Sequence, residues 1–353
     1  STSRRQRQLC IRDSHFGDDP TSVDYERIFY ARRPILETAV KNFLVNQSLQ
    51  ADFNHFEKNN RLWLEDFAEF MAIKEHFGNQ ALQKWDDKKA VARDPKTLEK
   101  YRTMLVDQIQ YFKVTQYFFF KQWGELKDYA NQRGIKIIGD MPIYVAADSV
   151  EVWTKPELFQ LDEERNPLFV AGVPADQFSA TGQLWGNPLY AWEEHKKQGY
   201  TWWIHRIEES FKIYDVLRID HFKGFSDYWQ VDGKAEVAKD GSWQPGPGYD
   251  LFKAVKEQLG DLPIIAEDLG NIDDKARKLL ADCNYPGMKI LQFGFEDVSG
   301  KSLDSPHYCI PHSIVYTGTH DNDVTNGWYN GLTDQQQQYI NDYTPVSYTH
   351  LRA

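Results

Sequence analysis

The feature that most constrains the fold of this 353-residue chain is a set of short apolar runs that end in charged residues, with helical patterns between them. In the clearest run, residues 216–219 lead directly to Asp220. Arg218 and Asp220 are two positions apart, so on a strand they point to the same face, where the arginine keeps the carboxyl ionised. Such a carboxylate is a candidate nucleophile, although a structural ion pair explains the pattern equally well.

Similar runs recur along the chain. They are residues 114–120, 135–140 ending at Asp140, 263–266 ending at Glu267, 289–293, and 314–316 followed by His320 and Asp321. The first of them is rich in aromatic and branched residues, and a helical pattern over 122–132 separates it from the second. Strand, helix and strand in succession predict parallel pairing. Acids just past the carboxyl ends of several strands are typical of a barrel active site.

The fold class predicted from this order is α/β, with a (β/α)8 TIM barrel. A doubly wound sheet is the alternative, but no Gly-x-Gly-x-x-Gly turn follows any of the runs, which favours the barrel. The domain boundaries predicted from the patterns are an irregular lead-in over 1–22, a helical subdomain over 23–112, a catalytic barrel over 113–343, a loop subdomain inserted at 142–214, and a non-native tail over 344–353.

The composition and net charge argue against several classes of binding partner. The net charge of −11 argues against nucleic acid and anionic membranes as partners, and no apolar run approaches the length of a membrane helix. Cys10, Cys283 and Cys309 match neither a disulfide framework nor a metal spacing, so we predict a cytoplasmic protein without metal or cofactor. Tyrosine and tryptophan are abundant, and their flat rings suit sugar faces, although many must belong to the core.

Three of the acids suggest a chemistry. Arg218 keeps Asp220 charged, whereas Glu267 follows an apolar run without a nearby base and is expected to hold its proton. A charged nucleophile beside a protonated acid is the pair of retaining glycosidases, whose carboxyl groups lie about 5–5.5 Å apart. Asp321, with His320 beside it, would bind sugar hydroxyls. The alternative for each acid is a helix N-cap or a loop ion pair.

Five sequence blocks carry a resemblance to a known family. They are IIGDMPIYV at 137–145, GQLWGNPLY at 182–190, LRIDHFKG at 217–224, IAEDLG at 265–270 and YTGTHDN at 316–322. In this order and spacing, the blocks resemble the 4-alpha-glucanotransferase family, also called amylomaltase or disproportionating enzyme, of the α-amylase clan.

The resemblance implies a role for each matching position. Asp220 corresponds to the nucleophile, Glu267 to the acid/base and Asp321 to the transition-state stabiliser. The implied sugar contacts are Asp140, Arg218 and His320 in the donor subsite, Trp185 on a flexible loop over the acceptor side, and Phe293 and Asp297 as additional glucan contacts. Lys223 stands where the family usually has arginine.

The implied reaction is transfer of an α-1,4-glucan segment to the 4-hydroxyl of another glucan or of glucose, through a covalent glucosyl-Asp220 intermediate. α-1,4-Glucans and maltooligosaccharides are therefore the expected partners. Two alternatives are a glucan hydrolase of the same clan and an inactive glucan-binding fragment. Measured against the family, the chain is expected to be truncated at both ends, to hold barrel strands two to seven of eight, and to be poorly stable and weakly active as written.

Overall fold

The computed structural model describes residues 19, 21–175, 179–270 and 272–344. Most of the lead-in expected over 1–22, and the tail expected over 344–353 except its first residue, lie outside the described residues. The chain divides into two compact units. The first comprises residues 1–129, 148–156 and 163–165, and the second comprises 130–147, 157–162 and 166–353. Within the described residues, no helix is both long enough and apolar enough to cross a membrane.

The first unit is helical. Its helices are α2 (Tyr25–Leu44), α3 (Gln50–Asn59), α4 (Arg61–His76), α5 (Lys88–Val91), α6 (Pro95–Met104), most of α7 (Val106–Asn131) and α8 (Val150–Thr154), with 3-10 turns at η1 (Gln47–Leu49) and η2 (Leu82–Lys84). Helix α6 begins as its sequence predicts, because the Asp94 side chain accepts a hydrogen bond from Thr97 N and Pro95 occupies the first turn.

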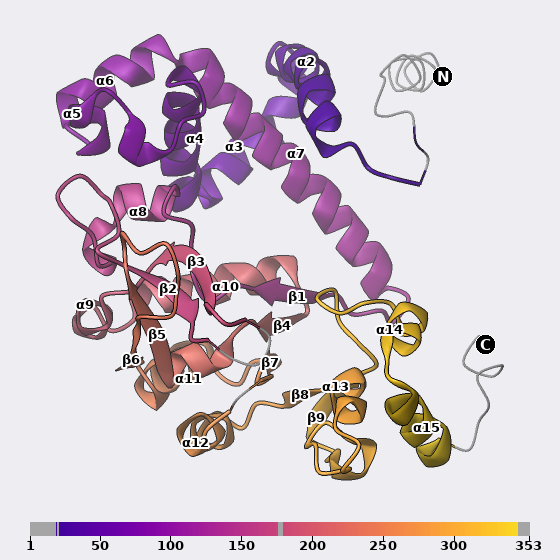
Figure 1. The fold of residues 1–353 in the computed structure, drawn as a ribbon. Helices are drawn as coiled ribbons and strands as arrows, with labels where there is room; N and C mark the ends of the chain where they lie inside the picture. Colours follow the sequence, from indigo (N-terminus) through magenta and orange to yellow (C-terminus); the bar gives the residue numbers. More distant parts are fainter. Residues whose placement is uncertain (1–18, 20, 176–178, 271, 345–353) are drawn as a thin grey trace. The chain divides into compact units, whose positions relative to one another are not determined.

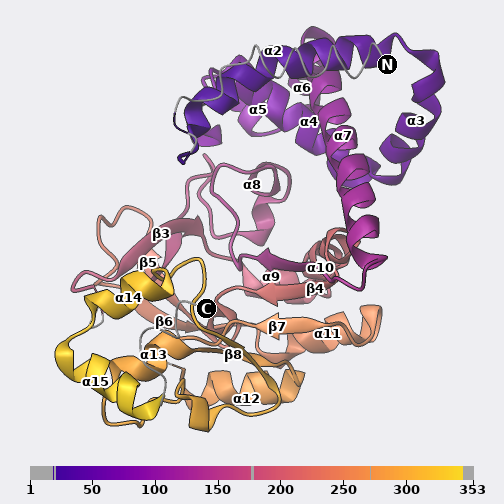
Figure 2. The ribbon, with the colours of Figure 1, turned by 90° about the vertical axis from the view of Figure 1, so that its right-hand side faces the viewer.

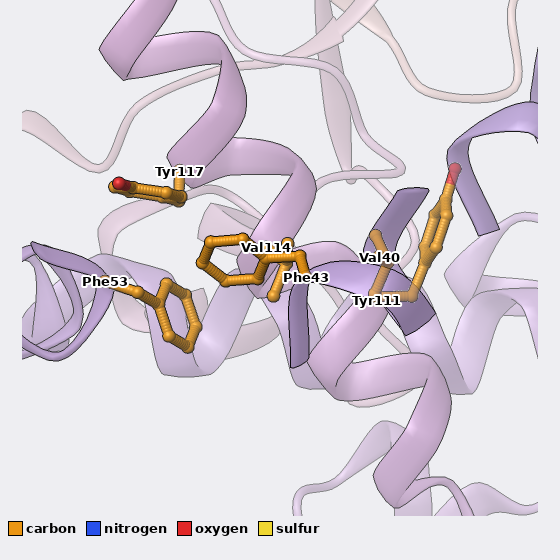
Figure 3. Packing of buried hydrophobic residues seen from close by; sticks show 6 residues of the cluster. All are labelled: Val40, Phe43, Phe53, Tyr111, Val114 and Tyr117. Atoms are coloured by element: carbon orange, nitrogen blue, oxygen red, sulfur yellow. The ribbon is translucent and has the colours of Figure 1, made fainter. Parts of the chain in front are cut away.

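Helix α7 corrects the strand that was predicted over 114–120. Tyr111, Val114 and Tyr117 recur every three residues, and on a helix this spacing places them on one face. Figure 3 shows this face against Val40 and Phe43 of α2 and, at the other end, Phe53 of α3. Burial of the stripe therefore overrides the strand preference of aromatic and branched residues. The boundary expected at 112/113 consequently falls inside a continuous helix.

Part of the insertion expected over 142–214 packs with the helical unit. The indole Nε1 of Trp153 in α8 donates to the carbonyl of Ala90 over 2.9 Å, and the Arg93 guanidinium lies 4.1 Å from the centre of the Trp153 ring. Asp148 forms an ion pair with Lys74 of α4. The insertion is therefore divided between the two units and is not a single subdomain.

The second unit contains the parallel strands. They are β1 (Ile138–Met141), β4 (Val216–Ile219) and β7 (Ile264–Ala266), paired in the order β1-β4-β7, and the parallel pair β8 (Gly287–Ile290) and β9 (Ser313–Tyr316). Ala266 N donates to Pro286 O over 3.0 Å, which joins the end of β7 to the residue before β8. Among the described residues, five of the six predicted parallel strands are thus present.

Helices connect these strands. They are α10 (Thr201–Ile213), α11 (Tyr249–Leu259) and α12 (Asp274–Cys283). Figures 1 and 2 show α10, α11 and α12 following one another beside the strands, and the contacts between successive helices agree. Strand followed by helix followed by parallel strand is the arrangement that the sequence predicted.

The strand predicted over 289–293 ends early. It stops at Ile290, and helix α13 (Leu291–Glu296) follows at once and contains Phe293. Leu291 and Phe295, four residues apart, share one helical face and pack with residues of α14 (Thr325–Gly331) and α15 (Asp334–Tyr343). This packing stabilises a helix where the local apolar run alone indicated a strand.

An antiparallel sheet was not predicted. Its order is β3-β2-β5-β6, made of β2 (Phe169–Val173), β3 (Gln183–Pro188), β5 (Asp227–Asp232) and β6 (Ser242–Pro245). Strand β2 comes from the expected insertion, and β5 follows the Asp220 segment through the 3-10 turn η4 (Phe222–Phe225). The remaining short elements are η3 (Pro156–Leu158), α9 (Trp192–Lys197) and η5 (Pro306–Tyr308). Trp185 therefore lies on a paired strand, and not on the loop that was expected.

Replacing glycine with alanine is expected to have opposite effects on stability at two positions. A Cβ on Gly139 in β1 would lie 2.0 Å from Cδ2 of Tyr214, whereas a Cβ on Gly124 in α7 would meet nothing within 4 Å. We expect Gly139→Ala to lower the free energy of unfolding by about 1–3 kcal/mol through overpacking. Gly124→Ala should raise it by about 0.5–1 kcal/mol, because alanine loses less entropy in a helix. Urea unfolding measures both, and an unchanged Gly139→Ala midpoint would contradict the close packing of β1.

Candidate active site

The site is built on an ion-pair triad at the carboxyl ends of β1 and β4. Asp140 and Arg218 are register partners on the two strands, so their side chains emerge side by side. Arg218 Nη1 lies 2.6 Å from Asp140 Oδ1 and 2.8 Å from Asp220 Oδ1. The arginine side chain is only 12% exposed, whereas those of Asp140 and Asp220 are 44% and 43% exposed. A largely buried cation thus holds two carboxylate side chains that are partly exposed.

Glu267 occupies a different environment, directly after β7. Its Oε2 accepts a hydrogen bond from His221 N and its Oε1 accepts one from Leu269 N, each over 2.8 Å. Burial raises the pKa of Glu267 to about 7, the Asp220 charge adds to the rise, and the two N–H donors and Arg218 oppose it. The carboxyl therefore exchanges its proton near neutral pH, as an acid/base group requires.

Backbone hydrogen bonds fix the Asp220 and Glu267 segments to each other. Asp220 N donates to Met141 O over 3.0 Å, and Glu267 N donates to Ile219 O over 2.9 Å. Past the strand end, Phe222 N donates to Glu267 O over 3.0 Å. The ladder of the sheet thus continues past the strand ends, and the structure brings Asp140, Arg218, Asp220 and Glu267 together, as the sequence predicted.

His221 is a site residue that the sequence interpretation missed. It has a positive φ of 49°, which turns its N–H toward Glu267, and its ring contacts Trp185 edge to face with centroids 4.8 Å apart. Burial, followed by the charge of Lys223, lowers the pKa of His221 to about 4, so the ring is neutral at pH 7. A Cβ on Gly224 would come within 3.0 Å of this ring. The signal in the sequence that could have identified His221 as a site residue is its position directly after Asp220.

Trp185 lies at the site, as predicted, although it is held by neighbours. Besides His221, its ring contacts Tyr144, with centroids 6.3 Å apart, and Tyr144 stacks on Tyr190. Trp185 remains 36% exposed. An anchored indole with an open face can serve as a platform for an apolar sugar face.

His320 and Asp321 lie in the loop between β9 and α14. His320 Nε2 is 3.4 Å from Asp321 Oδ2, and the two side chains are 68% and 74% exposed. Asp321 N donates to Thr319 Oγ1 over 3.3 Å. In the part of the chain that the structure describes, neither side chain forms a hydrogen bond or an ion pair with Asp220, Arg218 or Glu267.

Phe293 and Asp297 belong to helix α13 and its end. Phe293 is half-buried and packs against Met288 and Ile290 of β8. Asp297 is exposed, and its carboxylate accepts hydrogen bonds from the N–H and the hydroxyl of Ser299. Hydrogen bonds thus tie Asp297 to its own turn, and neither residue is joined to the triad by a described contact.

One group of side chains could in principle hold a metal ion. His205, Glu208 and Glu209 lie on α10, and their ligand atoms are within 4.8 Å of one another. Glu209 already forms an ion pair with Lys212, so the group has a cation partner within the same helix. This surface cluster involves none of the predicted site residues.

Comparisons with known proteins identify the family of this chain. A family model described as 4-alpha-glucanotransferase matches residues 2–350. The chain is 53% identical over 330 residues to a 4-alpha-glucanotransferase of Streptococcus pneumoniae, covering 93% of this chain and 65% of the relative. It is 41% identical over 330 residues to a 4-alpha-glucanotransferase of Thermus thermophilus, covering 91% and 65% of the two chains.

Solved structures give the same result. An amylomaltase from Streptococcus agalactiae in complex with acarbose superposes with a TM-score of 0.92 at 58% identity, over 94% of this chain and 67% of that one. An amylomaltase from Corynebacterium glutamicum shares the fold with a TM-score of 0.70 at 18% identity, over 96% and 47%. The fold is therefore of the TIM-barrel type found in the α-amylase clan.

The chain belongs to the 4-alpha-glucanotransferase family. It spans 65% of the length of the Streptococcus pneumoniae and Thermus thermophilus relatives.

The raised pKa of Glu267 can be measured directly. We expect the Glu267 carboxyl to titrate near pH 7, and Asp220→Asn to lower this pKa because a like charge is removed. Arg218→Met should raise it, because the guanidinium favours the ionised carboxyl. Carbon-13 NMR titration of labelled glutamate side chains measures the changes, with Asp297→Asn as the control that leaves Glu267 unaffected. A titration at the ordinary value of 4.5 would show that Glu267 is not desolvated.

Proposed function

We propose that this chain carries the catalytic core of an enzyme that transfers a segment of an α-1,4-glucan to the 4-hydroxyl of an acceptor glucan or glucose, with retention at the anomeric carbon. The observation that carries the proposal is the pairing of Asp220, held by Arg218, with a partly buried Glu267 whose pKa is about 7. Two carboxyl groups in such different environments suit the nucleophile and the acid of a retaining mechanism. Membership of the family supports the same reaction.

The mechanism has two displacements. The Asp220 carboxylate attacks the anomeric carbon while Glu267 gives its proton to the departing glycosidic oxygen, which leaves as the hydroxyl of the shortened chain. An ester between the glucan segment and Asp220 results. The Glu267 carboxylate then takes the proton of an acceptor 4-hydroxyl, whose oxygen attacks the anomeric carbon and releases Asp220. Glu267 is protonated again, so both proton transfers balance.

The other residues complete the proposed site. Asp140, Arg218 and His320 bind the donor sugar, and Asp321 stabilises the transition state; the high exposure of His320 and Asp321 leaves both free to meet a ligand. Trp185 provides the acceptor platform, with its open face and its support from His221. Phe293 and Asp297 provide additional glucan contacts. α-1,4-Glucans and maltooligosaccharides are the proposed partners, and the acarbose complex of the Streptococcus agalactiae amylomaltase supports a ligand of this kind.

The same proposal extends to the scaffold. Strands β1, β4, β7, β8 and β9 are five of the eight strands of a (β/α)8 barrel, and the helical N-terminal region and the residues inserted after Met141 are additions to it. In this arrangement the acids at the strand ends lie at the carboxyl face, where barrel enzymes have their active sites. A cytoplasmic location agrees with a reaction on storage glucans or their breakdown products.

Product analysis on maltotriose tests the activity. We expect glucose and longer maltooligosaccharides to form without a net increase in reducing ends, because a sugar takes the segment from the ester. Asp220→Asn should reduce turnover at least about a thousandfold, since the nucleophile is lost, while maltotriose binding persists. A steady rise in reducing ends would indicate hydrolysis instead. Undiminished turnover by Asp220→Asn would exclude Asp220 as the nucleophile.

The pH dependence gives a second test. Glu267 must be protonated to donate, and with a pKa of about 7 its protonated fraction falls as the pH rises through 7. We therefore expect kcat/KM for maltotriose to fall about tenfold for each pH unit above 7. Initial rates between pH 5 and 9 measure this limb. A profile that stays flat to pH 9 would mean that Glu267 does not act as the acid.

A further inference from the structure

Lys223 forms the second charge cluster beside the site. It is three residues past Asp220, in η4, and its side chain is only 12% exposed. The ammonium nitrogen lies 2.7 Å from Asp273 Oδ2, 3.1 Å from Asp227 Oδ1 and 4.7 Å from the centre of the Trp243 ring. A largely buried lysine with two carboxylates and an aromatic face around it is held in one place.

Lys223 and its three partners come from four different elements. Lys223 is in η4, Asp227 begins β5, Trp243 is on β6, and Asp273 is the N-cap of α12. Asp273 has two bonds at once, because its Oδ1 accepts from Ala276 N over 2.9 Å while its Oδ2 faces the lysine. The Lys223 contact, ahead of this N–H, lowers the pKa of Asp273 to about 2, so the Asp273 carboxylate stays ionised at neutral pH.

The cluster connects the segments that carry the two reacting carboxyls. The Asp220 and Glu267 segments touch at their near ends, where His221 N donates to the Glu267 carboxylate and Phe222 N donates to its carbonyl. The bond from Lys223 to Asp273 joins the same two segments again, six residues beyond Glu267. Two attachment points restrain the rotation that a single one would allow.

We infer that Lys223 is a positioning residue, which holds the Glu267 carboxyl in place against Asp220 by tying the start of α12 to the segment after the nucleophile. The inference rests on the proposed function, because the inference takes Glu267 to be the acid of that reaction. A purely structural lysine would affect all donors equally when it is removed. A residue that positions the acid affects most the donor that needs a proton on its leaving group.

Two donors separate these cases. Maltotriose needs a proton on the departing oxygen, whereas α-maltosyl fluoride releases fluoride with little help from an acid. The readouts are first-turnover rates of glucose release and of fluoride release. We expect Lys223→Met to slow glucose release about tenfold to a hundredfold with KM nearly unchanged, and to slow fluoride release much less. Lys223→Arg should restore most of the rate, and Lys234→Met, at an exposed lysine in the β5–β6 connection, should leave both rates unchanged.

Equal losses on both donors, or no loss on either, would overturn the inference. Hydrogen exchange at the amides of His221 and Leu269, which bind the Glu267 carboxylate, provides a readout that does not need turnover. Both amides should exchange faster in Lys223→Met and normally in Lys223→Arg, and unchanged exchange would also overturn the inference. A wild-type chain inactive on both donors would contradict the proposed function, and the exchange data alone would then decide on Lys223.

A second variant covers the case in which Lys223→Met does not fold. Asp273→Asn keeps an oxygen that can accept from Ala276 N, so the cap of α12 survives while the charge facing Lys223 is removed. The same order of effects is expected at smaller size, with glucose release slowed more than fluoride release. Equal effects on the two donors would again assign the cluster to stability alone.

Discussion

The Arg218 guanidinium, placed between Asp140 and Asp220, is the interaction on which the site depends. Two acids on neighbouring parallel strands repel each other, and one buried cation makes their proximity favourable. The parallel register of β1 and β4 places Asp140 opposite Arg218, and Asp220 follows the end of β4, so the ion pairs also help to hold the strand ends together. Asp220 is thereby held by Arg218 while its side chain stays 43% exposed.

Glu267 shows how the same sheet creates an opposite environment one strand away. Its carboxyl is enclosed, and two backbone N–H groups fix its position without neutralising the cost of burial, so the proton is retained to about pH 7. The proposed roles of nucleophile and acid follow from this difference. Lys223, with its partners Asp227 and Asp273, adds a second connection between the segments that carry Asp220 and Glu267. Ion pairs around the site therefore also help to position these segments.

Sequence patterns predicted the parallel strands well where an apolar run stood between clear helix signals, as at 216–219 and 263–266. They failed at 114–120, which is helical, and over 289–293 they extended the strand past its end at Ile290. In both places aromatic and branched residues form a helix because their faces are buried against distant segments. The antiparallel sheet was missed for a related reason. Strand β2 pairs with β5, which lies more than fifty residues further along the chain.

The sequence by itself determined the family and the pairing of Arg218 with Asp220, because two residues on one strand face need no distant partner. Only the tertiary structure decided the proton affinity of Glu267, the turn at His221 that orients its N–H, and the contacts of Lys223 with Asp227, Trp243 and Asp273. Desolvation and side-chain contacts of this kind arise between segments far apart in sequence, so no local pattern encodes them.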